Sequence, residues 1–254
     1  GAFAGRRTAS GRGMVLNMYI LAIDTTATTA TAALTDDDKL IALYTLNTGL
    51  THSKTMLDMV ENMMKNAQIK VCDIGVFACA AGPGSFTGVR IGISLIKGLA
   101  FGRNVPCIPV SALEALAENM LPAVRSECLI SPVMDARRAQ FYQAWFSVND
   151  GKVHRMIEDR MISAEELDRE MAEYDRAVYL VGDGCCAASE LLKYKKVKVA
   201  AEAMRYANAY SVAAVAYRKW KKNRETAFCS DSELRPFYLR APQAERERKS
   251  RESG

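Results

Sequence analysis

Histidine is almost absent from this sequence: its two histidines, His52 and His154, lie far apart. Imidazole is the commonest metal ligand and general base in proteins, and metal motifs usually space two ligands closely in the chain. No such pair exists here, and no histidine is spaced to act as the base for Ser85 or for a cysteine. The sequence therefore argues against a catalytic zinc or iron site and against serine and cysteine hydrolases.

Long hydrophobic runs are also missing. The most apolar stretch, around residues 91–101, is interrupted by Lys97 and Gly98, whereas a membrane-spanning helix needs about 20 apolar residues. The seven cysteines form an odd set without CxxC spacing, which indicates reduced thiols rather than a disulfide framework or a zinc motif. These absences favour a cytoplasmic protein that does not enter a membrane.

Excess positive charge is confined to the ends of the chain. The formal net charge is +5, but Arg6, Arg7 and Arg12 lie within residues 1–17, and residues 241–254 form a mixed-charge tail. The part between is nearly neutral, which predicts weak intrinsic binding to nucleic acid. Residues 1–17 lack apolar periodicity and are expected to be an extension or leader outside the fold. The charged tail is expected to be disordered.

The first part of the remaining chain predicts one α/β lobe. Strands and helices are distinguished by their apolar periods of two and 3.6 residues. The expected order is strand, strand, strand, helix, strand, helix and strand, at residues 19–24, 30–34, 40–45, 52–67, 76–80, 87–101 and 107–110. This βββαβα pattern with a further strand predicts a lobe over residues 18–110.

From Ser111 the pattern starts again. After a short helix, three strands, a helix and a strand are expected at residues 129–134, 141–148, 153–162, 164–174 and 178–182. Ser111 with Glu114, and Ser163 with Glu166, have the spacing of capping boxes at helix starts. These elements predict a second lobe over residues 111–205, and a final amphipathic helix at residues 209–222 is expected to pack back on the first lobe.

A glycine-rich turn, AAGPGSFTGVR at residues 80–90, leaves the fourth strand and enters a helix. Free backbone amides and the helix dipole at such a turn favour an anion. No lysine follows, so the turn is not a P-loop, and Ser85 lacks the flanking residues of a nucleophile elbow. The turn therefore predicts an anion contact at Gly82, Gly84 and Ser85.

The same turn carries a resemblance to a known family. GPGSFTGVRIG at residues 82–92, with KGLA at residues 97–100, resembles the most characteristic stretch of the TsaB (YeaZ) family. Four further motifs match in the family's order. They are LAIDTT at residues 21–26, THS at residues 51–53, MDARRAQFY at residues 134–142 and PFYLR at residues 236–240.

The resemblance implies the fold of the actin, sugar kinase and Hsp70 superfamily, with two lobes each built on a βββαβα core. In that superfamily the turn after the first strand, here Asp24 and Thr25, faces nucleotide phosphate and magnesium. With Gly82, Gly84 and Ser85 these residues form a candidate site for ATP or ADP with magnesium. The alternative is that no cofactor binds, because Asp24 can instead cap the amides of its own turn.

The resemblance also implies that a metal site has been lost. The catalytic paralogue, TsaD, holds its metal with an HxxxH pattern after the strand that follows the glycine-rich helix, and this spacing lets two imidazoles face one ion. The equivalent positions here are Ala112 and Leu116, which cannot bind a metal. The chain is therefore expected to be a non-catalytic subunit.

Two helices of the first lobe are candidates for a partner surface. The helix at residues 52–67 has a broad apolar arc with four methionines, which are flexible enough to suit several partners, although a buried core helix fits the same pattern. Glycines in the next helix permit close approach by another helix. The candidate interface comprises Met56, Met59, Val60, Met63, Met64, Gly92, Leu95 and Leu99.

The resemblance implies that these helices pair with TsaD and, in its absence, with a second copy of the chain. The ATPase TsaE is expected to join the pair, and tRNA is expected to be contacted only through the complex. The expected function is activation of TsaD for formation of N6-threonylcarbamoyladenosine in tRNA. The alternatives are a nucleotide-binding ATPase that uses Asp24 and, with no visible nucleophile, a glycoprotease-like peptidase.

Overall fold

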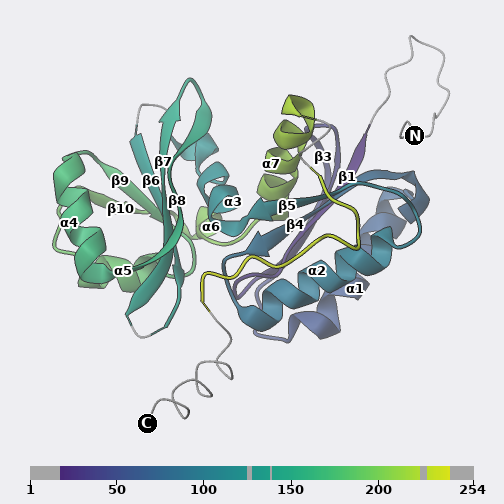
Figure 1. Cartoon of the computed structure of the whole chain (residues 1–254), viewed down its shortest axis with the longest axis horizontal. Helices are drawn as coiled ribbons and strands as arrows, with labels where there is room; N and C mark the ends of the chain where they lie inside the picture. Colours follow the sequence, from purple (N-terminus) through teal and green to yellow (C-terminus); the bar gives the residue numbers. More distant parts are fainter. Residues whose placement is uncertain (1–17, 125–127, 138, 224–227, 241–254) are drawn as a thin grey trace.

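The computed structural model describes residues 18–124, 128–137, 139–223 and 228–240. The predicted leader at residues 1–17 and the tail at residues 241–254 lie outside the described residues. Figure 1 shows two sheets, each covered by helices on its outer face, with further helices between them. None of the helices in the described ranges is long and apolar enough to cross a membrane.

The first sheet has the strand order β3-β2-β1-β4-β5. Its strands are β1 (Tyr19–Asp24), β2 (Ala30–Asp36), β3 (Lys39–Leu46), β4 (Ile74–Gly82) and β5 (Cys107–Ser111). The first three strands are antiparallel, and β4 and β5 run parallel to β1 and to each other. Because β1 lies at the centre and is covered on both faces, its sequence is an almost continuous apolar run rather than an alternating one.

Helices cover both faces of this sheet. The helices α1 (His52–Ala67) and α2 (Phe86–Ala100) share one core with it. On the opposite face lie α7 (Ala209–Lys222), which contacts β1 and β2, and α3 (Ala112–Glu118), which contacts α7. The predicted helix bounds for α1 are confirmed, and those for α2 differ by one residue at each end.

The second sheet repeats this arrangement with the strand order β10-β9-β6-β7-β8. Its strands are β6 (Cys128–Asp135), β7 (Gln140–Asn149), β8 (Lys152–Ser163), β9 (Val178–Val181) and β10 (Val197–Val199). The helices α4 (Ala164–Tyr174) and α5 (Cys185–Leu191) cover its outer face, and α6 (Glu202–Arg205) leads towards α7. The prediction of two lobes, each built on a βββαβα core, is confirmed, although α5, β10 and α6 were not predicted.

Local capping accounts for two of the helix starts. Ser163 and Glu166 form the predicted capping box of α4. Ser111 caps α3 by accepting from the amide of Glu114 at 3.1 Å. The Glu114 carboxylate does not return to Ser111 but lies 3.1 Å from Nζ of Lys219 on α7, so only half of that predicted capping box forms.

The lobes share a continuous core around α3 and α7. It combines residues of the first sheet, such as Ile20 and Ile108, with residues of the second, such as Ile130 and Phe146. The guanidinium of Arg218 on α7 binds both carboxylate oxygens of Glu118 on α3, with the NH2 to Oε2 distance at 2.7 Å. This packing holds the two sheets together.

Residues 228–240, the C-terminal strap, run along α2 without forming a helix or a long strand (Figure 1). Cys229 pairs with Cys107 through two backbone hydrogen bonds of 2.9 Å, and Leu234 is buried in the core beneath α2. The amide of Phe237 donates to the carbonyl of Ala81 at 2.7 Å. Arg240 then donates to the carbonyl of Ala136 at 2.5 Å, so the strap connects the first lobe to the second.

Candidate docking groove and glycine-rich turn

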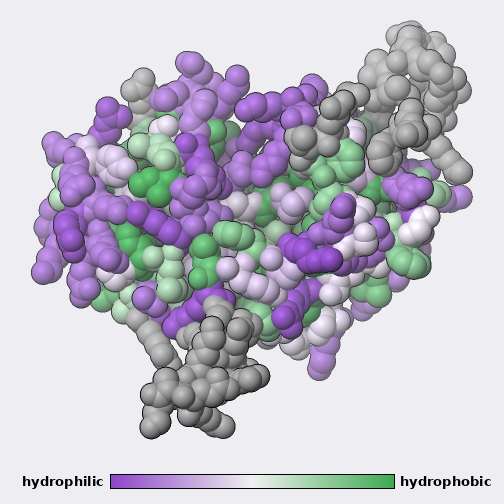
Figure 2. Space-filling view, in the orientation of Figure 1, coloured by the Kyte–Doolittle hydropathy of each residue, from purple (hydrophilic) through white to green (hydrophobic). Residues whose placement is uncertain are grey.

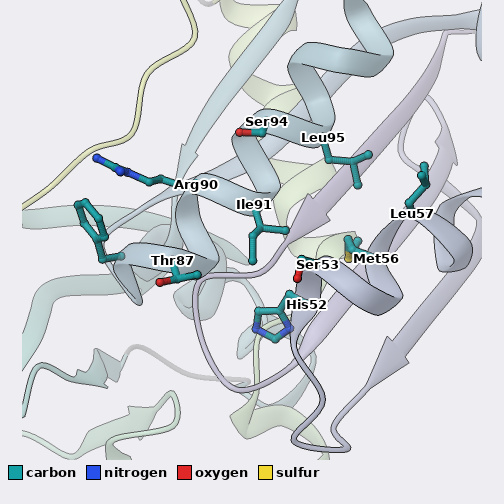
Figure 3. A pocket seen from close by; sticks show the side chains of 10 residues that line it. His52, Ser53, Met56, Leu57, Thr87, Arg90, Ile91, Ser94 and Leu95 are labelled. Carbon is teal, nitrogen blue, oxygen red and sulfur yellow. The ribbon is translucent and has the colours of Figure 1, made fainter.

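A groove of about 490 Å³ lies between α1 and α2, on the face of the first sheet opposite α7. Both helices pack on the same core and contact each other. Figure 3 shows α1 side chains on one side of the groove and α2 side chains on the other. The lining consists of His52, Ser53, Met56, Leu57, Phe86, Thr87, Arg90, Ile91, Ser94 and Leu95.

The groove is mainly apolar. Leu57 is 46% exposed, and Ile91 and Leu95 are half-buried. Its described lining contains no carboxylate, and Arg90 is its permanently charged residue. Figure 2 shows hydrophobic residues and residues of intermediate hydropathy mixed with hydrophilic ones where Figure 1 places α1 and α2. An amphipathic helix of a partner suits such a groove.

The predicted interface residues on α1 are core residues instead. Met56, Met59, Val60, Met63 and Met64 are at most 7% exposed and pack between α1, α2 and the first sheet. This burial argues against a partner surface formed by Met59, Val60, Met63 and Met64. Met56 also lines the groove, so its contact with a partner stays a prediction. The apolar arc is broad because α1 lies over both β2 and β3 and borders α2, and flexible methionines fill the space between these elements.

The predicted interface residues on α2 divide into two groups. Gly92 is buried, and a Cβ at this position would lie 2.6 Å from Oγ1 of Thr25. Its small size allows α2 to approach the turn after β1, and its burial argues against a contact with a partner. Leu95 and Leu99 are half-buried at the edge of the core, and Leu95 lines the groove. Their contact with a partner stays a prediction.

The residues predicted to bind nucleotide lie close together in the structure, but they contact one another directly. Oγ1 of Thr25 donates to the carbonyl of Gly88 at 2.7 Å, and the amide of Ser85 donates to the carbonyl of Thr26 at 2.7 Å. Gly84 has φ of +156°, and a Cβ there would lie 2.4 Å from the Thr26 carbonyl oxygen. The turn after β1 and the turn after β4 therefore lie in direct contact.

The amides of Ser85, Gly88 and Val89 are already bonded within the chain. Oγ of Ser85 accepts from the amide of Gly88 at 3.3 Å as the N-cap of α2, and the amide of Val89 donates to the Ser85 carbonyl at 2.8 Å. A Cβ on Gly82 would lie 2.3 Å from the carbonyl oxygen of Phe237 in the strap. The Ser85 amide is therefore not available to an anion, and an anion contact at Gly82 and Gly84 stays a prediction.

Asp24 caps its own turn. Its Oδ1 accepts from the amide of Thr26 at 2.8 Å and from Oγ1 of Thr26 at 2.7 Å, which confirms the local-capping interpretation. Its Oδ2 is buried and has no hydrogen-bond partner among the described residues. Burial raises the pKa of the Asp24 carboxyl, and the hydrogen bonds from Thr26 oppose that rise.

A second hollow, of about 310 Å³, lies between the lobes beside Gly82. Its lining includes three carboxylates and two cations, namely Glu114, Glu158, Asp159, Arg155 and Lys219. Arg155 lies within 3.8 Å of all three carboxylates. Because negative charge is in excess, this hollow disfavours the phosphates of a nucleotide. Nucleotide binding to this chain stays a prediction.

Sequence comparison places the chain among known proteins. A family model described as TsaD, tRNA N6-adenosine threonylcarbamoyltransferase, matches residues 47–248. The tRNA threonylcarbamoyladenosine biosynthesis protein TsaB of Bacillus subtilis (strain 168) is 35% identical over 165 residues, 65% of this chain and 71% of that protein. The protein of the same name from Escherichia coli (strain K12) is 31% identical over 69% of this chain and 76% of its own length. The chain belongs to the TsaB family.

A solved structure agrees with this assignment at the level of the fold. YeaZ from Pseudomonas aeruginosa superposes with a TM-score of 0.75 at 22% sequence identity. The match covers 87% of this chain and 100% of that chain. Both lobes are therefore shared with a solved structure whose sequence has diverged widely.

In this member of the TsaB family, the positions of the TsaD histidine pair are core positions. Ala112 and Leu116 lie on α3 and are at most 3% exposed. They contribute to the core that joins the two sheets. Among the described residues, no group of three or more histidine, cysteine, aspartate or glutamate side chains could hold a metal ion.

Two described basic residues of the second lobe, Arg137 and Lys196, lie outside both hollows. Arg137 follows β6 with φ of +65°, and its amide donates to Oδ1 of Asp135 at 2.6 Å. Arg138 lies outside the described residues. Lys196 lies on the second lobe, 2.5 Å from Oδ1 of Asp175. Neither Arg137 nor Lys196 lines the groove or the hollow between the lobes.

Three residues at one end of the groove were not predicted from the sequence. The ring of Tyr238 in the strap stacks on Phe86, with their centroids 4.9 Å apart. Arg90 contacts both rings and lines the groove. The motifs at residues 82–92 and 236–240 contain these residues, but their separation in the chain hides the contact between them.

Proposed function

We propose that this chain is a non-catalytic subunit in the biosynthesis of threonylcarbamoyladenosine in tRNA, and that it binds a TsaD-like catalytic subunit through the groove between α1 and α2. The similarity to TsaB proteins of tRNA threonylcarbamoyladenosine biosynthesis and to the TsaD family model supports a role in this pathway. The observation that carries the docking proposal is the groove itself, which is apolar, open and free of carboxylates in its described lining. A TsaE-like ATPase joins this pair, and tRNA is contacted through the assembled complex.

The packing of α3 supports the non-catalytic role. Where the resemblance places two metal-binding histidines in TsaD, this chain has alanine and leucine that join its two lobes. A histidine pair introduced there would have to break this core to reach an ion. Without the partner, a second copy occupies the groove, because exposed apolar surface of this kind favours association.

Leu57→Glu tests the docking proposal. Leu57 is 46% exposed and lines the groove, so a charge there leaves the fold intact and opposes burial against a partner. We expect binding to the TsaD-like subunit, measured by isothermal titration calorimetry, to weaken by at least about tenfold. The homodimer, measured by light scattering, should weaken as well.

Leu191→Glu is the matched control. Leu191 is 50% exposed on α5 of the second lobe, away from the groove. This variant should bind the TsaD-like subunit with unchanged affinity. If Leu57→Glu also binds with unchanged affinity while remaining folded, the groove is not the docking surface.

A further inference from the structure

Arg90 is held rigidly at one end of the groove. Its Nε donates to the hydroxyl of Tyr238 at 2.8 Å, and its Cζ lies 3.9 Å from the centroid of the Phe86 ring. The two rings stack with an interplanar angle of 29°. Figure 3 shows Arg90 beside a ring at the groove's end, near the backbone of the strap. Both the helix and the strap therefore fix the direction of this guanidinium.

The charge of Arg90 is not neutralised by any carboxylate in the part of the chain that the structure describes. The ion pairs there involve Arg155, Arg160 and Arg218 among the arginines, and not Arg90. Arg90 is exposed, and its hydrogen bond to Tyr238 uses Nε alone. Its two terminal nitrogens thus face solvent as a preorganised fork, which is the geometry that binds a carboxylate through two hydrogen bonds.

We propose that the partner helix in the groove carries an aspartate or glutamate that pairs with Arg90, and that the C-terminal strap is part of the docking surface because Tyr238 orients Arg90 for this pair. This inference rests on the proposed docking of the catalytic subunit and specifies the chemistry of that partner. An apolar helix with one acidic residue complements a groove whose described lining holds one guanidinium and no carboxylate.

The same charge distribution favours the catalytic subunit over a second copy. A second copy presents the same groove, whose lining offers no carboxylate to Arg90. Pairing groove to groove therefore leaves both guanidinium groups without a partner, and charges buried without a partner oppose association. The apolar residues of the groove do not distinguish the catalytic subunit from a second copy, so Arg90 provides the preference for the catalytic subunit.

The test compares Arg90→Ala, Arg90→Lys and Tyr238→Phe for binding to the TsaD-like subunit at low and high salt. Arg90→Ala is expected to weaken binding by about tenfold or more at low salt and to remove most of its salt dependence. Arg90→Lys keeps the charge but loses the planar fork, so it should retain the salt dependence at reduced affinity. Tyr238→Phe, which removes only the hydroxyl that holds Nε, should weaken binding by about threefold.

Arg103→Ala is the matched control, because Arg103 is also exposed, follows α2, and is held through Nε by the carbonyl of Leu99 at 2.9 Å. It does not line the groove and should leave the affinity unchanged. Self-association of Arg90→Ala should be equal to or stronger than that of the wild type.

Two results would overturn the inference. In the first, folded Arg90→Ala binds the TsaD-like subunit with unchanged affinity and unchanged salt dependence, whereas Leu57→Glu abolishes binding. This result leaves the docking proposal in place. The other is an equal loss of self-association in Arg90→Ala, which would assign Arg90 to the homodimer. Unchanged binding of Leu57→Glu contradicts the docking proposal itself, so the two failures are distinguishable.

Discussion

Gly88→Ala tests the direct contact between α2 and the turn after β1. An added Cβ would lie 2.0 Å from the carbonyl oxygen of Thr25, below the 3.0 Å that real Cβ atoms keep. The helix would have to move away by roughly 1 Å. That movement breaks the hydrogen bond of 2.7 Å from Oγ1 of Thr25 to the Gly88 carbonyl, which is buried.

The net effect follows from three contributions. Loss of the buried hydrogen bond costs about 1–3 kcal/mol, and overpacking costs about 1–3 kcal/mol. Alanine is favoured over glycine in a helix by about 1 kcal/mol. The two costs exceed the gain, so we expect the free energy of unfolding to fall by about 1–5 kcal/mol.

Urea unfolding followed by far-UV circular dichroism measures this change, with Gly98→Ala as the control on the same helix. A Cβ on Gly98 meets nothing within 4 Å, so this variant should be more stable than the wild type by up to about 1 kcal/mol. If Gly88→Ala is as stable as the wild type, the two turns are not in contact, and the glycine-rich turn is open to a ligand after all.

Two further variants test burial in the first core and at the end of the second sheet. The double variant Met59→Glu, Met63→Glu places two carboxylates in a core where Met63 is 0% exposed, so circular dichroism should show loss of the fold; a folded variant would contradict the burial of α1. Burial, aided by the neighbouring Asp135 carboxylate, raises the pKa of Asp183 from 3.8 to about 6. The folded state therefore binds this proton more tightly, and the contribution of Asp183 to stability is full below pH 3.8 and is lost as the pH rises to about 6. Asp183→Asn should remove this part of the pH dependence in urea unfolding, and an unchanged profile would show that Asp183 titrates normally.

Much of the fold could be predicted because its elements have strong local signals. The run of apolar residues in β1 and the broad apolar arc of α1 gave their positions, and Ser163 with Glu166 marked the start of α4. The elements that were missed are short: α5 has seven residues and β10 has three. Such lengths hold too few periods for an apolar pattern to be distinguished from a loop.

The candidate site was predicted less well, for a physical reason that α1 illustrates. Periodicity shows which residues share a face of a helix, but not whether a sheet or a partner covers that face. The five apolar residues assigned to the interface share such a face and are buried in the core with the sheet and α2, although Met56 also lines the groove. Leu57, which lines the groove, was identified as part of the same arc but could not be separated from it by sequence alone.

The sequence by itself determined the family, the order of the strands and helices, and the lack of a closely spaced histidine pair, because each of these depends on residues that are near one another in the chain. The tertiary structure alone decided that the glycine-rich turn is closed by the turn after β1 and that Tyr238 holds Arg90 from 148 residues away. Both contacts depend on how distant segments of the chain pack together, and that packing cannot be inferred from local residue patterns.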